Sequence, residues 1–204
     1  SLNVPTYTVS RDIATAELDE LYAKLKPKGV SVSALLAKAV GLTLAKHPII
    51  NAAYAPHAVE YHEDINVAMA VATADGGLIT PVLKQADSRH ITELAASWKD
   101  LVARANAGKL KPDEFLSGTF TISNLGMFGV STFVSILPPN TGAIMAVAAS
   151  TPTFVQQPNG MMGMVKQMTV TLTCDHRHIY GADAAKFLKD LGELLENDIL
   201  SLVV

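Results

Sequence analysis

Cysteine and charge are both scarce in this sequence. Cys174 is the single cysteine among 204 residues, so an intramolecular disulfide is excluded and a reducing compartment is favoured. Charged residues make up only 17% of the chain, below the usual quarter. The low charge leaves apolar surface that we expect to be hidden between subunits.

Long hydrophobic runs and basic clusters are also missing. The apolar stretch from Gly142 to Ala149 is far shorter than a membrane span. The 16 basic residues are outnumbered by 19 acidic ones, and Lys24 to Lys28 holds only three lysines, so no nucleic-acid-binding surface is predicted. The sequence starts at Ser1 without an initiator methionine or a signal peptide, which we interpret as an excised or processed fragment. We expect a soluble protein that binds neither membranes nor nucleic acids.

Apolar residues recur with helical spacing in four segments. The predicted helices begin at Ala14 and stop at Pro27, begin near Ser31 or Ser33 and end before Pro48, run from about Thr92 to Asn106, and run from about Ala182 to Glu196. The second of these helices is apolar nearly all round, so we expect it to be buried.

Short runs of β-type residues fill the rest of the sequence. Strands are predicted at 51–55, 58–62, 66–73, 78–84, 119–123, 132–137, 142–149 and 164–174, with turns at Gly76-Gly77 and Asn159-Gly160. Three methionines, Met161, Met162 and Met164, flank the second turn, and we expect them to pack in the core or between subunits, or to cover a pocket. The pattern predicts one α/β domain over residues 1–204, with a mixed β-sheet flanked by helices.

The densest polar cluster is Asp175-His176-Arg177-His178, between a predicted strand and a predicted helix. Loop residues in such a place can be held rigidly and still meet a substrate, which makes His176 a candidate for catalysis. A structural hydrogen-bonding role for this histidine stays open on position alone. Ser123 closes a predicted strand before the Asn124 to Gly126 turn, and its plain interpretation is likewise structural.

Three ordered motifs resemble those of the 2-oxo acid dehydrogenase complex acyltransferases. They are Gly77 to Val82 (GLITPV), Gly118 to Gly129 (GTFTISNLGMFG), and Asp175-His176-Arg177 followed by Gly181 to Ala185 and Phe187-Leu188. The similarity extends over nearly the whole chain from about Pro5. The stretch from Ile136 to Ser150 is most similar to members from cyanobacteria and plastids that serve pyruvate dehydrogenase.

The resemblance implies a fold like that of chloramphenicol acetyltransferase, with three subunits that form active-site channels between neighbours. The implied reaction moves an acyl group, acetyl above all, between the sulfur of dihydrolipoamide and the sulfur of coenzyme A, without a metal or a covalent acyl-enzyme. His176 matches the family's general base, and Ser123 matches the hydroxyl that stabilises the oxyanion. The resemblance also implies a supporting role in the catalytic loop for Asp175, Arg177, Tyr180 and Asp183, and a place in the substrate channel for Asn124, Leu125, Gly126 and Met127.

Further expectations about partners follow from the resemblance. They are a homotrimer that can build a larger cage, a lipoyl group carried on a separate domain, and decarboxylase and dihydrolipoamide dehydrogenase components. The expected location is the chloroplast stroma, with bacterial cytoplasm or mitochondrial matrix as alternatives. Alternative functions are an assembly scaffold with weakened catalysis, a core for another acyl group, and a free-standing acetyltransferase for a small acceptor.

One position departs from the family pattern. The family has Asp, sometimes Asn, four residues after the histidine, and this sequence has Tyr180. A phenol carries no charge at neutral pH, so Asp175 or Asp183, or a backbone carbonyl, must then hold the second imidazole nitrogen. Cys174 is a rival nucleophile in principle, but alternate residues on a strand are about 6.6 Å apart, and a core position is favoured. His176 and His178 lack further ligands at convincing spacing for zinc, so no metal is predicted.

Overall fold

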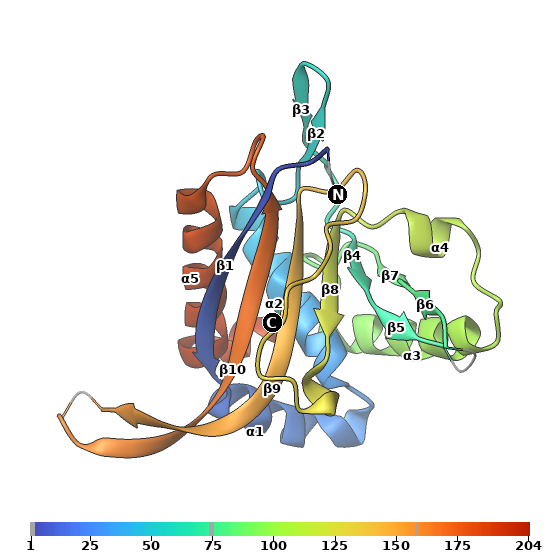
Figure 1. Ribbon diagram of the computed structural model, residues 1–204. Helices are drawn as coiled ribbons and strands as arrows, with labels where there is room; N and C mark the ends of the chain where they lie inside the picture. Colours follow the sequence, from blue (N-terminus) through green and yellow to red (C-terminus); the bar gives the residue numbers. More distant parts are fainter. Residues whose placement is uncertain (1–2, 74–75, 158) are drawn as a thin grey trace.

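The fold is built on a mixed six-stranded sheet with the order β1-β10-β9-β8-β4-β7 (Figure 1). The computed structural model describes residues 3–73, 76–157 and 159–204. The strands of this sheet are β1 (Thr6–Ala14), β4 (Val67–Met69), β7 (Val82–Leu83), β8 (Phe120–Asn124), β9 (Ala143–Gln156) and β10 (Met162–Asp175). β8 runs parallel to both of its neighbours, β4 and β9, and the other pairs are antiparallel. Two smaller ladders join β2 (Ala53–Ala55) to β3 (Ala58–Glu60) and β5 (Val71–Ala72) to β6 (Leu78–Ile79).

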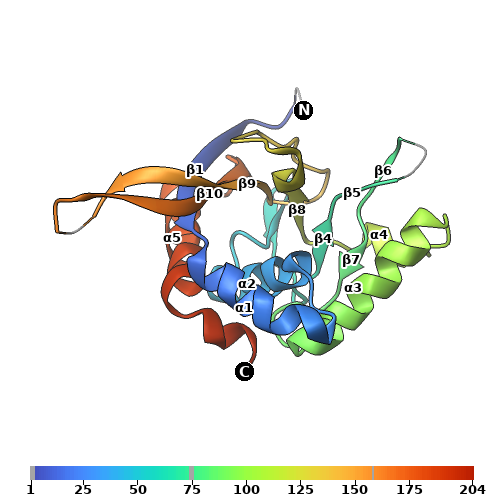
Figure 2. The same cartoon turned by 90° about the horizontal axis from the view of Figure 1, so that it is seen from below.

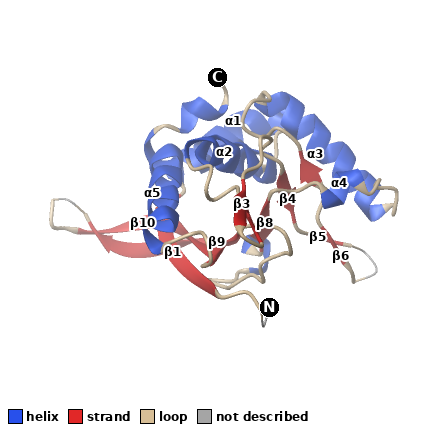
Figure 3. Ribbon diagram, turned by 90° about the horizontal axis from the view of Figure 1, so that it is seen from above, coloured by secondary structure: helices blue, strands red, loops and turns tan. Residues whose placement is uncertain are grey.

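The long helices cover one face of this sheet, as Figures 2 and 3 show. They are α1 (Ala16–Leu25), α2 (Val32–Lys46), α3 (Ile91–Asn106) and α5 (Gly181–Asn197), and a short α4 (Asp113–Leu116) lies at the far end of the sheet. Single 3₁₀ turns span Lys26–Lys28, Gly126–Phe128 and Ile199–Leu202. Among the described residues no single helix is long and apolar enough to cross a membrane, and one bent pair, Ala16–Lys28 with Val32–Lys46, passes by length and composition only.

α2 is the central helix of the core, as its apolar sequence predicts. The Ser31 hydroxyl caps its first turn by accepting a hydrogen bond from the Ala34 backbone N–H (3.2 Å). Gly41 lets the helix approach the chain at Ala86, because a Cβ at position 41 would lie 2.6 Å from the Ala86 carbonyl carbon. The buried Lys38 ammonium donates to the carbonyl oxygens of Asp87 (2.6 Å) and Arg89 (2.8 Å), so its charge is solvated inside the protein.

Alternate side chains of β8 point to opposite faces of the sheet, and only one of these faces packs against the helices. Phe120 and Ile122 are fully buried in the core, and the Phe120 ring lies 6.0 Å from that of Phe187 on α5. Thr121 and Ser123 therefore point to the opposite face of the sheet. The segment from Gly126 to Thr141 passes over that face (Figure 2).

Two predictions about secondary structure are wrong. The segment 132–137 forms no strand, because β8 already has β4 and β9 on its two sides and leaves no ladder position for this stretch. Residues Thr6–Ala14 form a nine-residue strand, β1, where none was predicted, so that the first helix starts at Ala16 rather than at Ala14. The remaining predicted helices are confirmed to within a few residues, and the short helix α4 was not predicted.

Candidate active site

A loop between β10 and α5 carries the predicted catalytic cluster. The buried Asp175 carboxylate accepts hydrogen bonds from Arg177 through Nε (2.9 Å), Nη2 (2.6 Å) and the backbone N–H (3.0 Å). Burial by itself raises the pKa of Asp175, but the hydrogen bonds from Arg177 outweigh it and the pKa is lowered. The Arg177 guanidinium also lies 3.9 Å above the ring centroid of Tyr54. The bonds between Asp175 and Arg177 therefore tie the two residues of the loop together.

The two histidines of the cluster have opposite environments. His178 is 5% exposed, and its Nε2 donates to the Ala52 carbonyl oxygen (3.1 Å), so it fastens the loop to the end of β2. His176 is exposed. No group of three or more His, Cys, Asp or Glu side chains suited to a metal ion occurs in the described parts of the chain. His178 therefore has a structural role, while His176 is accessible at the surface.

The His176 imidazole lies close to two tyrosine rings. The Tyr7 ring of β1 is 4.3 Å away between centroids, and the Tyr180 ring is 5.9 Å away and edge-on. The His176 backbone N–H donates to the carbonyl oxygen of Pro5 (2.8 Å). These tilted and edge-on ring contacts and the backbone bond hold the residue at the end of the sheet.

Neither nearby carboxylate bonds to the His176 ring within residues 3–73, 76–157 and 159–204. Asp175 is engaged by Arg177, and Asp183 accepts a hydrogen bond from the backbone N–H of Tyr180 (3.1 Å). Asp183 thereby caps the first turn of α5, which begins immediately after the loop. Asp183 therefore helps to fix the conformation of the loop. The His176 imidazole is contacted instead by the rings of Tyr7 and Tyr180.

Tyr7 is a positioning residue that sequence reasoning missed. Replacing Tyr7 by alanine removes the ring that packs against His176, and we expect the turnover of a reaction that uses this imidazole as a base to fall about three- to tenfold, the value of one aromatic pair. Tyr7→Phe keeps the ring and loses only the hydroxyl group. If the ring is what matters, this variant should have the turnover of the wild type. Steady-state kcat and the melting temperature of both variants check this. Equal turnover of Tyr7→Ala and wild type at equal stability contradicts it.

Cys174 is a core residue, as predicted. Its side chain is fully buried, and burial raises the pKa of the thiol to about 12. A thiol that stays protonated and out of contact with solvent cannot accept an acyl group from a substrate.

Ser123 lies near the end of β8, before a tightly fixed turn. The Asn124 side-chain oxygen accepts from the Gly126 N–H (2.9 Å), and the Leu125 N–H donates to the Val147 carbonyl oxygen (3.1 Å). A Cβ on Gly126 would come within 3.1 Å of the Ala148 carbonyl oxygen, so the turn packs closely against β9 there. Asn124 and Leu125 thus shape the turn, and Met127, 86% exposed, projects from it.

A cleft of about 790 Å³ opens beside Thr121, on the sheet face that also carries Ser123. A second cavity of about 310 Å³ borders Asp175 and Arg177. Both are lined by the chain from Pro138 to Thr141. Both cavities therefore lie at the end of the sheet where β8 begins and β10 ends, and their walls combine apolar side chains with a few polar groups.

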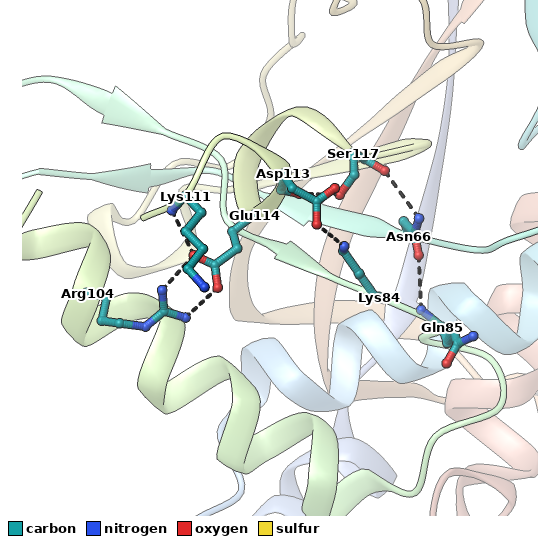
Figure 4. A network of polar contacts seen from close by, with 8 residues as sticks. All are labelled: Asn66, Lys84, Gln85, Arg104, Lys111, Asp113, Glu114 and Ser117. Atoms are coloured by element: carbon teal, nitrogen blue, oxygen red, sulfur yellow. Dashed lines mark hydrogen bonds and ion pairs between the residues drawn. The ribbon is translucent and has the colours of Figure 1, made fainter. Parts of the chain in front are cut away.

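The outer wall of the larger cleft is fixed by a polar network (Figure 4). Asn66 accepts from the Gln85 N–H (3.1 Å) and donates to the Ser117 carbonyl oxygen (3.3 Å). Behind it Arg104 forms two bonds to Glu114 (2.6 and 2.7 Å), which lower the pKa of that carboxyl to about 2. Lys84 pairs with Asp113, and Lys111 donates its backbone N–H to Glu114. α4 is thereby tied to α3 and β7.

Ser123 and His176 are far apart within one chain. Ser123 is in register with Ala146 of β9, and Ala146 with Thr171 of β10. His176 lies five residues beyond Thr171, about 16 Å along the strand, and two strand spacings add about 10 Å sideways, so the separation is about 19 Å. A base and an oxyanion donor must each lie within about 3 Å of the atoms they serve. These two side chains cannot act on one acyl group within a single chain.

The sequence matches the model of the 2-oxoacid dehydrogenases acyltransferase catalytic domain over residues 1–203. The chain belongs to this acyltransferase family. Component 5 of the chloroplastic pyruvate dehydrogenase complex of Arabidopsis thaliana, a dihydrolipoyllysine-residue acetyltransferase, is 54% identical over 198 residues, 97% of this chain and 42% of that protein. The corresponding component of Rickettsia felis is 35% identical over 187 residues, 92% of this chain and 45% of that protein. The chain spans less than half the length of these relatives.

Solved structures confirm the predicted fold of this acyltransferase. The cubic core of a pyruvate dehydrogenase multienzyme complex has a TM-score of 0.91 at 32% identity, covering 100% of this chain and 86% of that one. The dihydrolipoamide acetyltransferase of Azotobacter vinelandii, studied for the catalytic roles of a serine, a histidine and an asparagine four residues after it, has a TM-score of 0.91 at 31% identity over the same shares. A chloramphenicol acetyltransferase has a TM-score of 0.66 at 14% identity, covering 95% of this chain and 89% of that one, and shares the fold.

Proposed function

We propose that this chain is the catalytic domain of a dihydrolipoyllysine-residue acetyltransferase and forms the core of a pyruvate dehydrogenase complex. It transfers an acetyl group between the sulfur of dihydrolipoamide and the sulfur of coenzyme A. The observation that carries the proposal is the exposed His176 imidazole, which contacts the rings of Tyr7 and Tyr180 on a loop that Asp175 and Arg177 brace. The 54% identity to a chloroplastic acetyltransferase supports the substrate class.

The reaction needs a base and an oxyanion donor. A free thiol has a pKa of about 8.5, so at neutral pH only a few per cent is thiolate and a neutral imidazole is a suitable acceptor for its proton. His176 takes the proton from the coenzyme A thiol, and the sulfur attacks the carbonyl carbon of the lipoyl thioester. The Ser123 hydroxyl donates to the oxygen as it gains charge. The bond from carbon to the lipoyl sulfur then breaks, and the imidazolium returns the proton to that sulfur.

Each active site uses two copies of the chain. The separation of about 19 Å within one chain favours a site made by His176 of one copy and Ser123 of the next. Such a contact joins two different surfaces and closes into a ring, in agreement with the expected homotrimer. Larger cages built from such trimers are the second level of assembly.

Mixing two inactive variants tests the shared site. His176→Ala and Ser123→Ala chains, unfolded together in equal amounts and refolded, should recover about a quarter of the wild-type turnover per site, because one interface in four joins an intact histidine to an intact serine. Each variant refolded alone is the control. Absence of recovery in mixed oligomers of wild-type mass contradicts a site shared between copies.

The proposed substrate arm and partners lie outside this chain. A lipoyl group on a separate domain brings the acetyl group from a decarboxylase component, and a dihydrolipoamide dehydrogenase component reoxidises the dithiol. The chloroplastic relatives favour the chloroplast stroma over bacterial cytoplasm or mitochondrial matrix. Comparison of acetyl with longer acyl donors tests the alternative of a different 2-oxo acid complex.

A scaffold with weakened catalysis is the second candidate, because Tyr180 follows His176 at the four-residue spacing at which the Azotobacter enzyme has an asparagine after its histidine. Tyr180→Asp should change turnover by less than about tenfold, since the Tyr7 ring already packs against His176 and aspartate is a good residue at the start of a helix. Initial rates of acetyl transfer check this, with Tyr61→Asp as an exposed control. A gain of several hundredfold favours the scaffold instead.

A further inference from the structure

A small hairpin stands at the end of the sheet where the loop between β10 and α5 lies. It consists of β2 and β3, which pair antiparallel with Tyr54 directly opposite Val59. Figure 1 shows this hairpin projecting beyond the end of the sheet. Tyr54 is 37% exposed, so its ring is neither part of the core nor free in solvent. The hairpin therefore meets the loop from outside the sheet.

The base of the hairpin is fastened to the loop through the backbone. The carbonyl oxygen of Ala52, the residue before β2, accepts a hydrogen bond from His178 Nε2 (3.1 Å). A Cβ on Gly142 would collide with the same carbonyl oxygen, so the chain at Gly142 packs directly against it. The Gly142 carbonyl oxygen in turn accepts from the Asp175 N–H (2.9 Å). The start of the hairpin and the start of the loop are thus packed together.

The Tyr54 ring makes a second contact with the loop. The central carbon of the Arg177 guanidinium lies 3.9 Å from the centroid of this ring. A cation in this place is attracted by the negative face of the ring. The Arg177 side chain is 31% exposed, and the ring covers part of the surface that would otherwise meet water. Arg177 is therefore held by the hairpin as well as by Asp175.

The bonds between Arg177 and Asp175 span His176. The Arg177 backbone N–H donates to Asp175 Oδ1 (3.0 Å), which makes a turn with His176 as its middle residue. Arg177 Nε and Nη2 donate to the same carboxylate (2.9 and 2.6 Å). The position of Arg177 therefore sets the backbone of His176, and the direction of the imidazole follows from that backbone.

We propose that Tyr54 is a positioning residue, whose ring holds the Arg177 guanidinium against Asp175 and thereby fixes the direction of the His176 imidazole. This role rests on the proposed function, because the direction of the imidazole matters to a base that takes the proton of a thiol. The ring carries the effect rather than the hydroxyl group, and it acts through Arg177 without touching a substrate.

Replacing Tyr54 by leucine tests the ring, because leucine is apolar but has no aromatic face. We expect kcat for acetyl transfer to fall about two- to fivefold, the value of a cation–π contact at a partly exposed site. The KM for coenzyme A should stay the same, since the ring acts on the loop and not on a substrate. Tyr54→Phe keeps the ring and should recover most of the lost turnover. Glu60→Ala, which shortens an exposed side chain of the same hairpin, is the matched control and should keep the wild-type rate.

A second background shows whether the effect passes through Arg177. Arg177→Lys keeps a positive charge beside Asp175 but lacks the flat guanidinium that lies on the Tyr54 ring. In that background Tyr54→Leu should lower kcat by a smaller factor than in the wild type, because the two changes remove the same contact. Losses that multiply in full overturn the inference.

Chemical modification of His176 gives a measure that needs no turnover. The rate at which diethyl pyrocarbonate modifies His176, followed by mass spectrometry, should rise about two- to fivefold in Tyr54→Leu because the loosened loop exposes the imidazole, and should not change in Glu60→Ala. Unchanged turnover and unchanged modification in Tyr54→Leu overturn the inference and leave the proposed function intact. A wild type that transfers no acetyl group, but whose His176 responds to Tyr54→Leu in this way, overturns the proposed function alone.

Discussion

Replacing His176 by alanine is expected to lower kcat/KM for acetyl transfer by about 10²- to 10⁴-fold, the usual contribution of a positioned general base. The imidazole is exposed and bonds to no other side chain in the described chain, so its removal should disturb neither the loop nor the oligomer. Steady-state rates with coenzyme A and acetyl-dihydrolipoamide, and the mass in solution, check both points.

A control histidine separates the loss of a base from a loss of folding. His57 has a positive φ of 70°, which asparagine adopts without much strain, so His57→Asn should keep full turnover. Near-normal turnover by purified, oligomeric His176→Ala protein contradicts the mechanism.

Replacing Ser123 by alanine is expected to lower kcat by about 10²- to 10³-fold, less than the loss of His176, because one oxyanion donor is removed while the base remains. The KM for both substrates should change little, since the hydroxyl acts on charge that develops in the transition state. Rates measured over a range of coenzyme A concentrations separate kcat from KM.

The conservative variant completes this test. Ser123→Thr retains a hydroxyl on a β-branched side chain that suits a strand, and it should recover part of the lost turnover. Equal rates for Ser123→Ala and wild type assign the serine to the structural role that its position before the turn also suggests.

The sequence by itself determined the elements whose causes are local. Ser31 and Pro48 mark the two ends of α2, and alternation marks β8 and β10. The motifs make Ser123 and His176 the candidates for the reacting groups. Gly160 takes a positive φ of 80° in the predicted hairpin turn, whose residue 158 lies outside the described chain. Such features are readable because capping, side-chain alternation and turn conformation depend on neighbours within a few residues.

Only the tertiary structure decided which distant segments meet. β1 forms a strand because it pairs with the free edge of β10. Residues 132–137 form no strand because β8 already pairs with β9 and β4 on its two sides. Tyr7 packs on His176 from the other end of the chain, and the strand register separates His176 from Ser123. Whether a segment pairs as a strand depends on which distant segments are available at the edge of the sheet, and local composition does not show this. For that reason the sequence points to His176 and Ser123 as candidates, and only the fold reveals how far apart they lie within one chain.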